Sequence, residues 1–229
     1  MPDREKAVLS EFVGTFALIF IGAGSIVANT LTQGAVGITG IALAHGLTIA
    51  VMVSAVGHIS GGHFNPAVTV GFLATRRISA AMAAMYIGAQ LLGAVVAGYT
   101  LKVIVPPEIA VASNLGATTL HPQIGIAAGL LTEAVLTFLL VFVIFGTAVH
   151  PQGPRGVAGF AIGMTVALDV LMGGPWTGAS MNPARTLGPA SATFLWENHW
   201  VYWIGPMLGG TVAAGFYHFV LIKGKIQGS

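Results

Sequence analysis

The sequence contains no cysteine and very little charge. Without cysteine the chain has neither a disulfide framework nor thiolate ligands for a metal. Asp, Glu, Lys and Arg make up 7% of the 229 residues, whereas a typical soluble domain carries about 25%. Hydrophobic residues make up 55%, and the mean hydropathy is +0.86. The composition therefore indicates an integral membrane protein surrounded by a lipid bilayer.

Other absences exclude further classes of function. The sequence shows no nucleophile–base pair, no metal-ligand cluster and no phosphate-binding glycine loop, so we expect no enzyme, no cofactor and no metal site. The formal net charge of +2 comes from a few residues at the ends and in loops. Because these charges form no basic patch, we expect no nucleic-acid partner.

Six apolar runs have about the length needed to cross a bilayer. The first run lacks a convincing signal-peptide cleavage site, so we expect it to remain in the mature protein. A longer loop, about 105–124, separates the third run from the fourth. The sequence therefore predicts an all-α membrane protein with spans at about 7–29, 35–57, 79–104, 125–149, 156–174 and 199–222.

Two similar segments indicate an internal duplication: SGGHFNPAVT at 60–69 and TGASMNPART at 177–186. A single offset of 117 residues relates several pairs: Asn65/Asn182, Gly57/Gly174, Gly61/Gly178, Gly88/Gly205 and Gly93/Gly210. We therefore divide a single channel-like domain, 1–229, into repeat one, about 7–104, and repeat two, about 125–222. Each repeat has three spans, an odd number, so the second must enter the membrane from the opposite side, as an inverted repeat.

Each of the two segments reads as a loop followed by a short helix. Asn is a favourable N-cap and proline fits the first helical turn, so we expect half-helices to start after Asn65 and Asn182. They should end near Arg76 and Ala192. In an inverted repeat their N-termini meet near the membrane midplane, where two positive dipole ends repel cations.

The residues before each asparagine are expected to be extended, with their carbonyls along a shared path, because non-helical backbone in a membrane must line a cavity or be buried. The amides of Asn65 and Asn182 would act as donors in the middle of that path. Such a path suits a file of neutral, hydrogen-bonding molecules. The alternative is two ordinary kinked helices. The expected carbonyls belong to Gly61, Gly62, His63, Phe64, Gly178, Ala179, Ser180 and Met181.

The placement of Lys and Arg predicts the orientation. If the N-terminus is cytoplasmic, the opposite side carries only Lys102, at the edge of a span. The cytoplasmic side then collects Arg4, Lys6, Arg76, Arg77, Arg155, Lys223 and Lys225. We therefore expect both termini to be cytoplasmic.

Over essentially its whole length the chain resembles the aquaporins of the major intrinsic protein family. The specific marks are the two Asn-Pro-Ala boxes, which include Pro66, Ala67, Pro183 and Ala184, and the Arg185 that follows the second box. The second half is similar to plant tonoplast intrinsic proteins, and the first span is more like microbial members. The resemblance implies a passive homotetrameric channel with one pore per subunit, for which we expect the cell (plasma or inner) membrane.

The family's outer filter falls, by spacing from the asparagines, on His45, Val170, Ala179 and Arg185. Strict water channels resemble a set with Phe in place of His45 and His in place of Val170. The smaller side chains here imply a wider constriction that passes water and small neutral solutes such as ammonia, hydrogen peroxide or urea. The alternatives are a glycerol/urea-type facilitator, a structural membrane protein with a closed pore, and a secondary transporter coupled through embedded acids.

Several embedded polar residues have expected supporting roles. The resemblance implies that Glu11 and Glu133 accept hydrogen bonds from the two loops, and we expect His63 to brace the first loop. His121 either contacts the outer mouth or is a solvated loop residue. Asp169 departs from the family pattern; it either pairs with a neighbouring helix or faces the pore and weakens cation exclusion. The spacing of Gly57/Gly61 and Gly174/Gly178 predicts close helix crossings.

Overall fold

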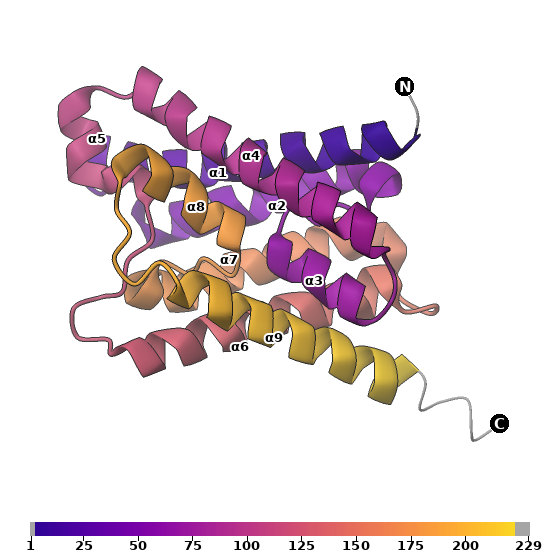
Figure 1. Ribbon diagram of the computed structural model, residues 1–229. Helices are drawn as coiled ribbons and strands as arrows, with labels where there is room; N and C mark the ends of the chain where they lie inside the picture. The colour runs from indigo at the N-terminus through magenta and orange to yellow at the C-terminus, as the bar shows by residue number, and fades with distance from the viewer. Residues whose placement is uncertain (1–2, 223–229) are drawn as a thin grey trace.

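The computed structural model describes residues 3–222, which form helices joined by loops (Figure 1). Within that range six helices are long and apolar enough to cross a membrane. Their helical cores are α1 (Asp3–Leu31), α2 (Gly37–Ser60), α4 (Ala80–Ile104), α6 (Ile126–Ile144), α7 (Ala158–Thr177) and α9 (Val201–Phe216). Two half-length helices, α3 (Pro66–Ala74) and α8 (Pro183–Thr193), lie between them. The shorter helical segments are α5 (Pro107–Ser113), η1 (Asn114–Gly116), η2 (Phe145–Val149), η3 (Arg155–Val157) and η4 (Tyr217–Ile222).

The packing of the helices repeats between the two halves. Helix α1 packs on α2 and α4, and its counterpart α6 packs on α7 and α9. Helices α2 and α7, one from each half, pack on each other, while α3 lies against α9 and α8 against α4. Figure 1 shows α3 and α8 approaching each other from opposite ends of the bundle. The predicted fold class, six spanning helices plus two half-helices in an inverted repeat, is confirmed.

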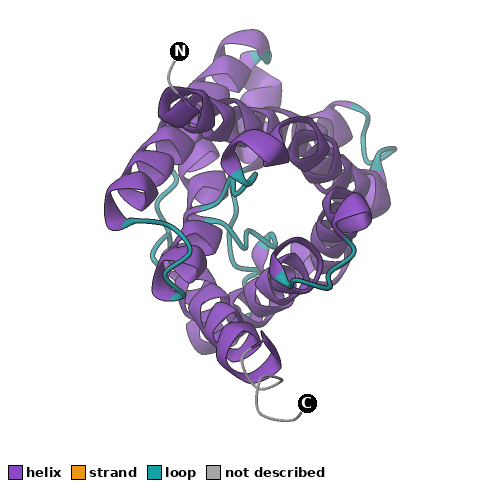
Figure 2. Ribbon diagram, turned by 90° about the vertical axis from the view of Figure 1, so that its right-hand side faces the viewer, coloured by secondary structure: helices purple, strands orange, loops and turns teal. Residues whose placement is uncertain are grey.

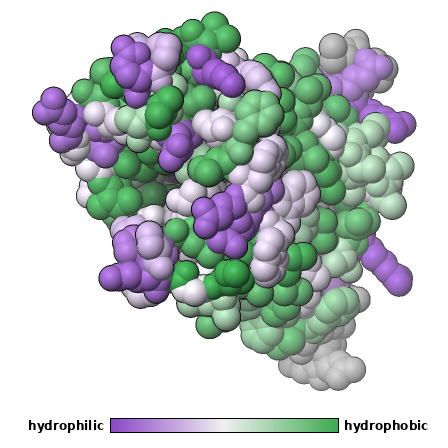
Figure 3. Space-filling model, turned by 60° about the vertical axis from the view of Figure 1, so that its left-hand side comes forward, coloured by the Kyte–Doolittle hydropathy of each residue, from purple (hydrophilic) through white to green (hydrophobic). Residues whose placement is uncertain are grey.

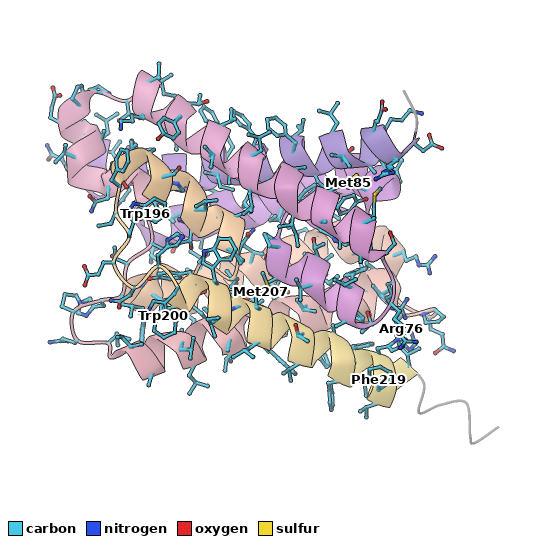
Figure 4. The ribbon with its side chains drawn as sticks, in the orientation of Figure 1. Arg76, Met85, Trp196, Trp200, Met207 and Phe219 are labelled. Carbon is cyan, nitrogen blue, oxygen red and sulfur yellow. The ribbon has the colours of Figure 1, made fainter. Side chains whose placement is uncertain are left out.

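The long helices surround the loops that precede the half-helices. Viewed along the bundle, the helices form a ring with loop segments running inside it (Figure 2). Figure 4 places Arg76 and Phe219 at the same end of the bundle as the start of α1, and Trp196 and Trp200 toward the opposite end. Lys223 and Lys225, which contributed to the predicted orientation, lie outside the described residues.

Side-chain size separates the interior from the lipid-facing surface. Small residues such as Ala23, Ala94 and Ala97 are buried at helix contacts, as is usual where helices pack closely in a membrane. Large apolar side chains such as Leu131 and Phe160 are exposed. In Figure 3 apolar surface separates the hydrophilic groups at the end of the bundle that carries the loop at 105–124 from those at the opposite end. This is the surface expected of a chain that crosses a bilayer.

The helix ends differ from the predicted ones in two places. Helix α7 continues through Pro175 to Thr177, although the glycines at 173–174 and this proline favoured an earlier end. The longer loop predicted at about 105–124, called the outer loop below, contains the short helix α5, which starts with Pro107 in its first turn. In the last turns of α6 and α9 the chain widens into the π-helical segments η2 and η4.

The glycine pairs predicted to form helix crossings have another role. Gly61 and Gly178 have φ angles of 92° and 83°, and their N–H groups donate to the carbonyls of Gly57 and Gly174. They therefore end α2 and α7 as left-handed C-caps, so the predicted crossing at these pairs was wrong. Helices α2 and α7 cross instead at Gly46 and Gly163, where a Cβ on either residue would collide with the carbonyl oxygen of the other.

Candidate functional site: a lined path between two half-helices

Each half-helix begins at an asparagine with extended backbone. Asn65 has φ −157° and its side-chain oxygen accepts from the N–H of Ala67 at 2.8 Å. Asn182 has φ −155° and accepts from the N–H groups of Ala184 and Arg185 at 2.9 and 3.3 Å. Pro66 and Pro183 stand in the first helical turn, where a missing N–H is tolerated. Both asparagines therefore cap their helices.

The same two amides tie the opposing loops together. The Nδ2 of Asn65 donates to the carbonyl of Met181 at 2.8 Å, and the Nδ2 of Asn182 donates to the carbonyl of Phe64 at 2.9 Å. Each amide has two N–H groups, so these bonds use one N–H on each asparagine. The N-termini of α3 and α8 thus meet face to face, held by reciprocal hydrogen bonds.

The loop backbone departs from the extended conformation that we predicted. Phe64 and Met181, which directly precede the asparagines, have φ angles of 48° and 53°, and Ala179 has φ 43°. Non-glycine residues in this region cost on the order of 1–3 kcal/mol each and persist only where the surroundings hold them. With the glycines at 61, 62 and 178, each loop has three residues of positive φ, two of them consecutive, so neither loop is an extended strand.

Glu11 holds the first loop in this conformation. One carboxylate oxygen accepts from the Ser60 hydroxyl at 2.7 Å and from the His63 N–H at 2.9 Å. The other accepts from the Phe64 N–H at 2.6 Å and from the Gln90 amide at 2.8 Å. The side chain is fully buried, and a buried carboxylate needs such donors. All four of its bonds therefore go to groups that shape or surround the loop.

Glu133 does the same for the second loop. It accepts from the Thr177 hydroxyl at 2.6 Å, from the Ser180 N–H at 3.0 Å and from the Met181 N–H at 2.7 Å. Thr177, Ser180 and Met181 are the counterparts of Ser60, His63 and Phe64 at the 117-residue offset. The inverted repeat thus places one acid behind each loop.

Two cavities follow one another along the bundle, a central one at the junction of the half-helices and an outer one toward the loop at 105–124. The narrow central cavity, about 30 Å³, is bordered by both asparagines and by Gly62, His63, Ala179, Ser180, Met181 and Arg185. The outer cavity, about 330 Å³, is bordered by Val170, Gly178 and His121, among others. Neither lining includes Gly61, which caps α2, or Phe64, whose side chain is in the core. The carbonyl of Phe64 still lies at the junction, where it accepts from the Nδ2 of Asn182, so the set of carbonyls along the path stays a prediction.

The two cavities meet at His45, and this level is called the constriction below. Among the residues that border the two cavities, His45 alone belongs to both. Val170 stands on the outer side of this level, and Ala179 and Arg185 stand on the inner side. Each of the four residues that spacing assigned to the filter thus borders a cavity next to His45, and their joint role as a filter stays a prediction.

His45 and Arg185 are held in a fixed arrangement. The Nδ1–H of His45 donates to the carbonyl of Ile41 at 2.9 Å, because a carbonyl can only accept. With Nδ1 carrying the proton, Nε2 accepts from the Arg185 guanidinium at 3.3 Å. A second guanidinium nitrogen donates to the carbonyl of Gly116 at 2.7 Å. Between residues 3 and 222 no carboxylate forms an ion pair with Arg185, so its charge stays at the constriction.

Comparison with known proteins agrees with this geometry. A family model described as "Major intrinsic protein" matches residues 2–218. This chain belongs to the major intrinsic protein family. It is 46% identical over 219 residues to "Aquaporin TIP4-4" of Zea mays (93% of this chain, 85% of the relative). It is 44% identical over 222 residues to "Aquaporin-4" of Bos taurus (94% and 67%). The solved aquaglyceroporin of Plasmodium falciparum superposes with a TM-score of 0.83 at 26% identity, covering 96% and 98% of the two chains.

Membership of the major intrinsic protein family makes the chain a passive membrane channel for water or small solutes, since the members of this family are channels and not enzymes. The predicted resemblance to aquaporins, tonoplast intrinsic proteins included, is confirmed.

The sequence left two alternative positions each for Asp169 and His121, and the structure shows where both residues lie. Asp169 is 4% exposed and borders neither cavity, so it does not face the path. Its Oδ2 has no hydrogen-bond partner among the described residues, unlike the paired carboxylate that we offered as an alternative. His121 borders the outer cavity, and its Nδ1 accepts from the N–H of Gln123 at 3.3 Å.

Sequence reasoning missed several residues that position this aquaporin site. Ser60 and Thr177 donate to the two acids, and the 117-residue offset pairs them in the sequence. The same offset pairs Thr69 with Thr186, whose hydroxyls contact His63 and Ser180. The Gly116 carbonyl that binds Arg185 gave no sequence signal, because it is a backbone group in a loop.

Proposed function

We propose that this aquaporin conducts water and small neutral solutes such as ammonia, and that it excludes ions and protons. The observation that carries the proposal is the constriction at His45, with Arg185 beside it and the small side chains of Val170 and Ala179 nearby. One wall supplies hydrogen-bond donors and the other is short and apolar.

The residues at this constriction leave room for neutral solutes other than water and provide a hydrogen-bond donor for them. A guanidinium has five N–H groups, and the bonds of Arg185 to the Gly116 carbonyl and to His45 use two of them, which leaves donors for a passing oxygen or nitrogen. Valine and alanine leave more room than the histidine and threonine of strict water channels would. A neutral molecule of the size of ammonia then keeps one hydrogen bond while it passes the narrow level.

Cations meet an unfavourable potential at two levels. The Arg185 charge stands at the constriction without an ion-pair partner within residues 3–222, and a charge in a narrow pore repels like charges strongly. Further in, α3 and α8 direct their N-terminal dipole ends at the same point. A water that accepts from both asparagine amides must turn its hydrogens away from them, which interrupts a proton-conducting chain of waters.

The remaining assignments complete the proposal. We place the chain in the cell membrane with both termini cytoplasmic, from the Lys and Arg distribution and the likeness of its first span to microbial members. The resemblance to tonoplast intrinsic proteins makes a vacuolar membrane the competing location. We assign a single domain with repeats at about 7–104 and 125–222, and a homotetramer with one pore per subunit. Fractionation of membranes tests the location, and the mass of the purified particle tests the homotetramer.

The central test is flux into proteoliposomes. Osmotic shock followed by stopped-flow light scattering measures water, and an internal pH dye under an ammonium gradient measures ammonia. We expect both to exceed the bare-lipid values, with no increase in proton or potassium leak. Fast water flux without ammonia flux would remove the wider solute range, glycerol flux above both would favour a glycerol facilitator, and no flux at all would refute the open pore.

A further inference from the structure

Gly22 on α1 lies directly behind the imidazole of His45. A Cβ built on Gly22 would come within 2.6 Å of both Cδ2 and Nε2 of His45 and within 3.1 Å of its Cε1. Its three nearest neighbours are thus all atoms of one ring. Contacts under about 3 Å are not tolerated in packed interiors, so any other residue at position 22 would force the ring to move.

The imidazole of His45 is held at both of its ring nitrogens. Its Nδ1 is bound to the Ile41 carbonyl of its own helix and its Nε2 to Arg185, so it cannot rotate in place without losing both bonds. His45 borders both cavities, whereas Gly22 borders neither. Gly22 therefore lies on the side of the ring away from the path, and displacement pushes the ring into the path.

The face of α1 that carries Gly22 follows the path. Leu18, four residues earlier, borders the central cavity, and Ile26, four residues later, borders the outer cavity. Residues four apart on a helix lie one above the other on the same face. Glycine thus occupies the one position on this face that lies level with the constriction, and His45 takes up the space that a side chain would fill.

From this juxtaposition we propose that Gly22 sets the width of the constriction by letting His45 withdraw from the path. Gly22 is a positioning residue: it acts on permeating molecules through the imidazole, and the inference rests on the proposed filter. A methyl at position 22 narrows the path and weakens the contact between His45 and Arg185. We expect Gly22→Ala to lower ammonia permeability about tenfold, the factor that a modest packing penalty in a barrier produces, and water permeability in the same direction.

The test compares four variants in proteoliposomes with equal amounts of folded protein. Gly24→Ala is the matched control on the same helix, because its Cβ would meet only Leu101 Cδ2, at an ordinary 3.5 Å; it should behave like the unmodified protein. His45→Ala removes the ring, so adding Gly22→Ala to it should change neither permeability. An equal loss from Gly22→Ala with and without His45 would overturn the inference, and so would unchanged flux in Gly22→Ala alone.

Folding and function remain separable in this design. If Gly22→Ala alone does not yield folded protein, the His45→Ala/Gly22→Ala double variant decides. Its recovery with the permeability of His45→Ala supports a clash with the ring, and failure to recover it overturns that explanation. An unmodified protein without water flux contradicts the proposed function, whereas normal flux that is insensitive to Gly22→Ala contradicts only the role of Gly22.

Discussion

Replacing Glu11 by glutamine tests how the first pore loop is held. The substitution keeps the size of the side chain but exchanges one acceptor oxygen for an amide that donates. The two oxygens of Glu11 accept four hydrogen bonds, two of them from the backbone N–H groups of His63 and Phe64. An amide in place of the second oxygen would face the Phe64 N–H donor to donor.

The loss of stability in Glu11→Gln depends on which of the lost hydrogen bonds the neighbouring residues can replace. Gln90 has an unpartnered, buried Oε1, so a rotation of its amide gives the new amide an acceptor, at the loss of its bond to Thr69. The Phe64 N–H has no such repair, because Glu11 and its surroundings exclude water. Losing a hydrogen bond to a charged group costs about 1.5–3 kcal/mol, so we expect a destabilisation of about 2–3 kcal/mol. This is comparable with the strain of a left-handed Phe64, about 1–3 kcal/mol.

Two measurements check this expectation. The temperature of unfolding in detergent should fall, and water permeability per folded protein should fall as the loop leaves its strained conformation. Glu133→Gln should act in the same way through Met181, whereas Glu108→Gln, at an exposed position on α5, should change neither quantity. If Glu11→Gln retains both the unfolding temperature and the flux, the carboxylate does not hold the loop and the explanation fails.

Three further predictions concern the filter, a buried acid and a helix crossing. Arg185→Ala should raise cation leak and retain water flux, because it removes the charge at the constriction; patch-clamp or dye leak measurements decide, and an unchanged leak would assign exclusion to the half-helices alone. Asp169→Leu should leave water flux and ion exclusion unchanged and raise stability by about 1–3 kcal/mol, the cost of an unsatisfied buried polar atom; a new ion leak would contradict its position away from the path. Gly46→Ala should destabilise the fold by about 1–3 kcal/mol through overpacking against Gly163, as measured by thermal unfolding. The control Gly215→Ala, with nothing within 4 Å of its Cβ, should be neutral, and equal effects of the two variants would contradict a close crossing of α2 and α7 at Gly46.

The repeated features of the molecule were predictable because duplication makes them visible. The 117-residue offset between Asn65 and Asn182 led to the half-helices, and an odd number of spans led to their opposed entry. The same offset pairs Ser60 with Thr177, so the hydroxyl donors to the two acids were within reach of the same reasoning.

Features that occur in one half only were not predictable. Gln90 supports Glu11 and Thr69, whereas its counterpart at the same offset is Met207, so no pairing drew attention to it. The contacts of Gly22 with His45 and of the Gly116 carbonyl with Arg185 depend on how α1 and the outer loop pack. The caps at Gly61 and Gly178 were misread because a glycine four residues after another suits a helix end as well as a crossing.

The most direct test of the proposed solute range is the ratio of ammonia to water permeability in the unmodified protein and in Val170→His. We attribute ammonia passage to the short apolar wall beside His45, so a larger, polar side chain at position 170 should bring ammonia flux close to the bare-lipid value while water flux stays well above it. Ammonia flux that is unaffected by Val170→His, or that falls only in proportion to water, would contradict the assignment of this wall as the determinant of the solute range.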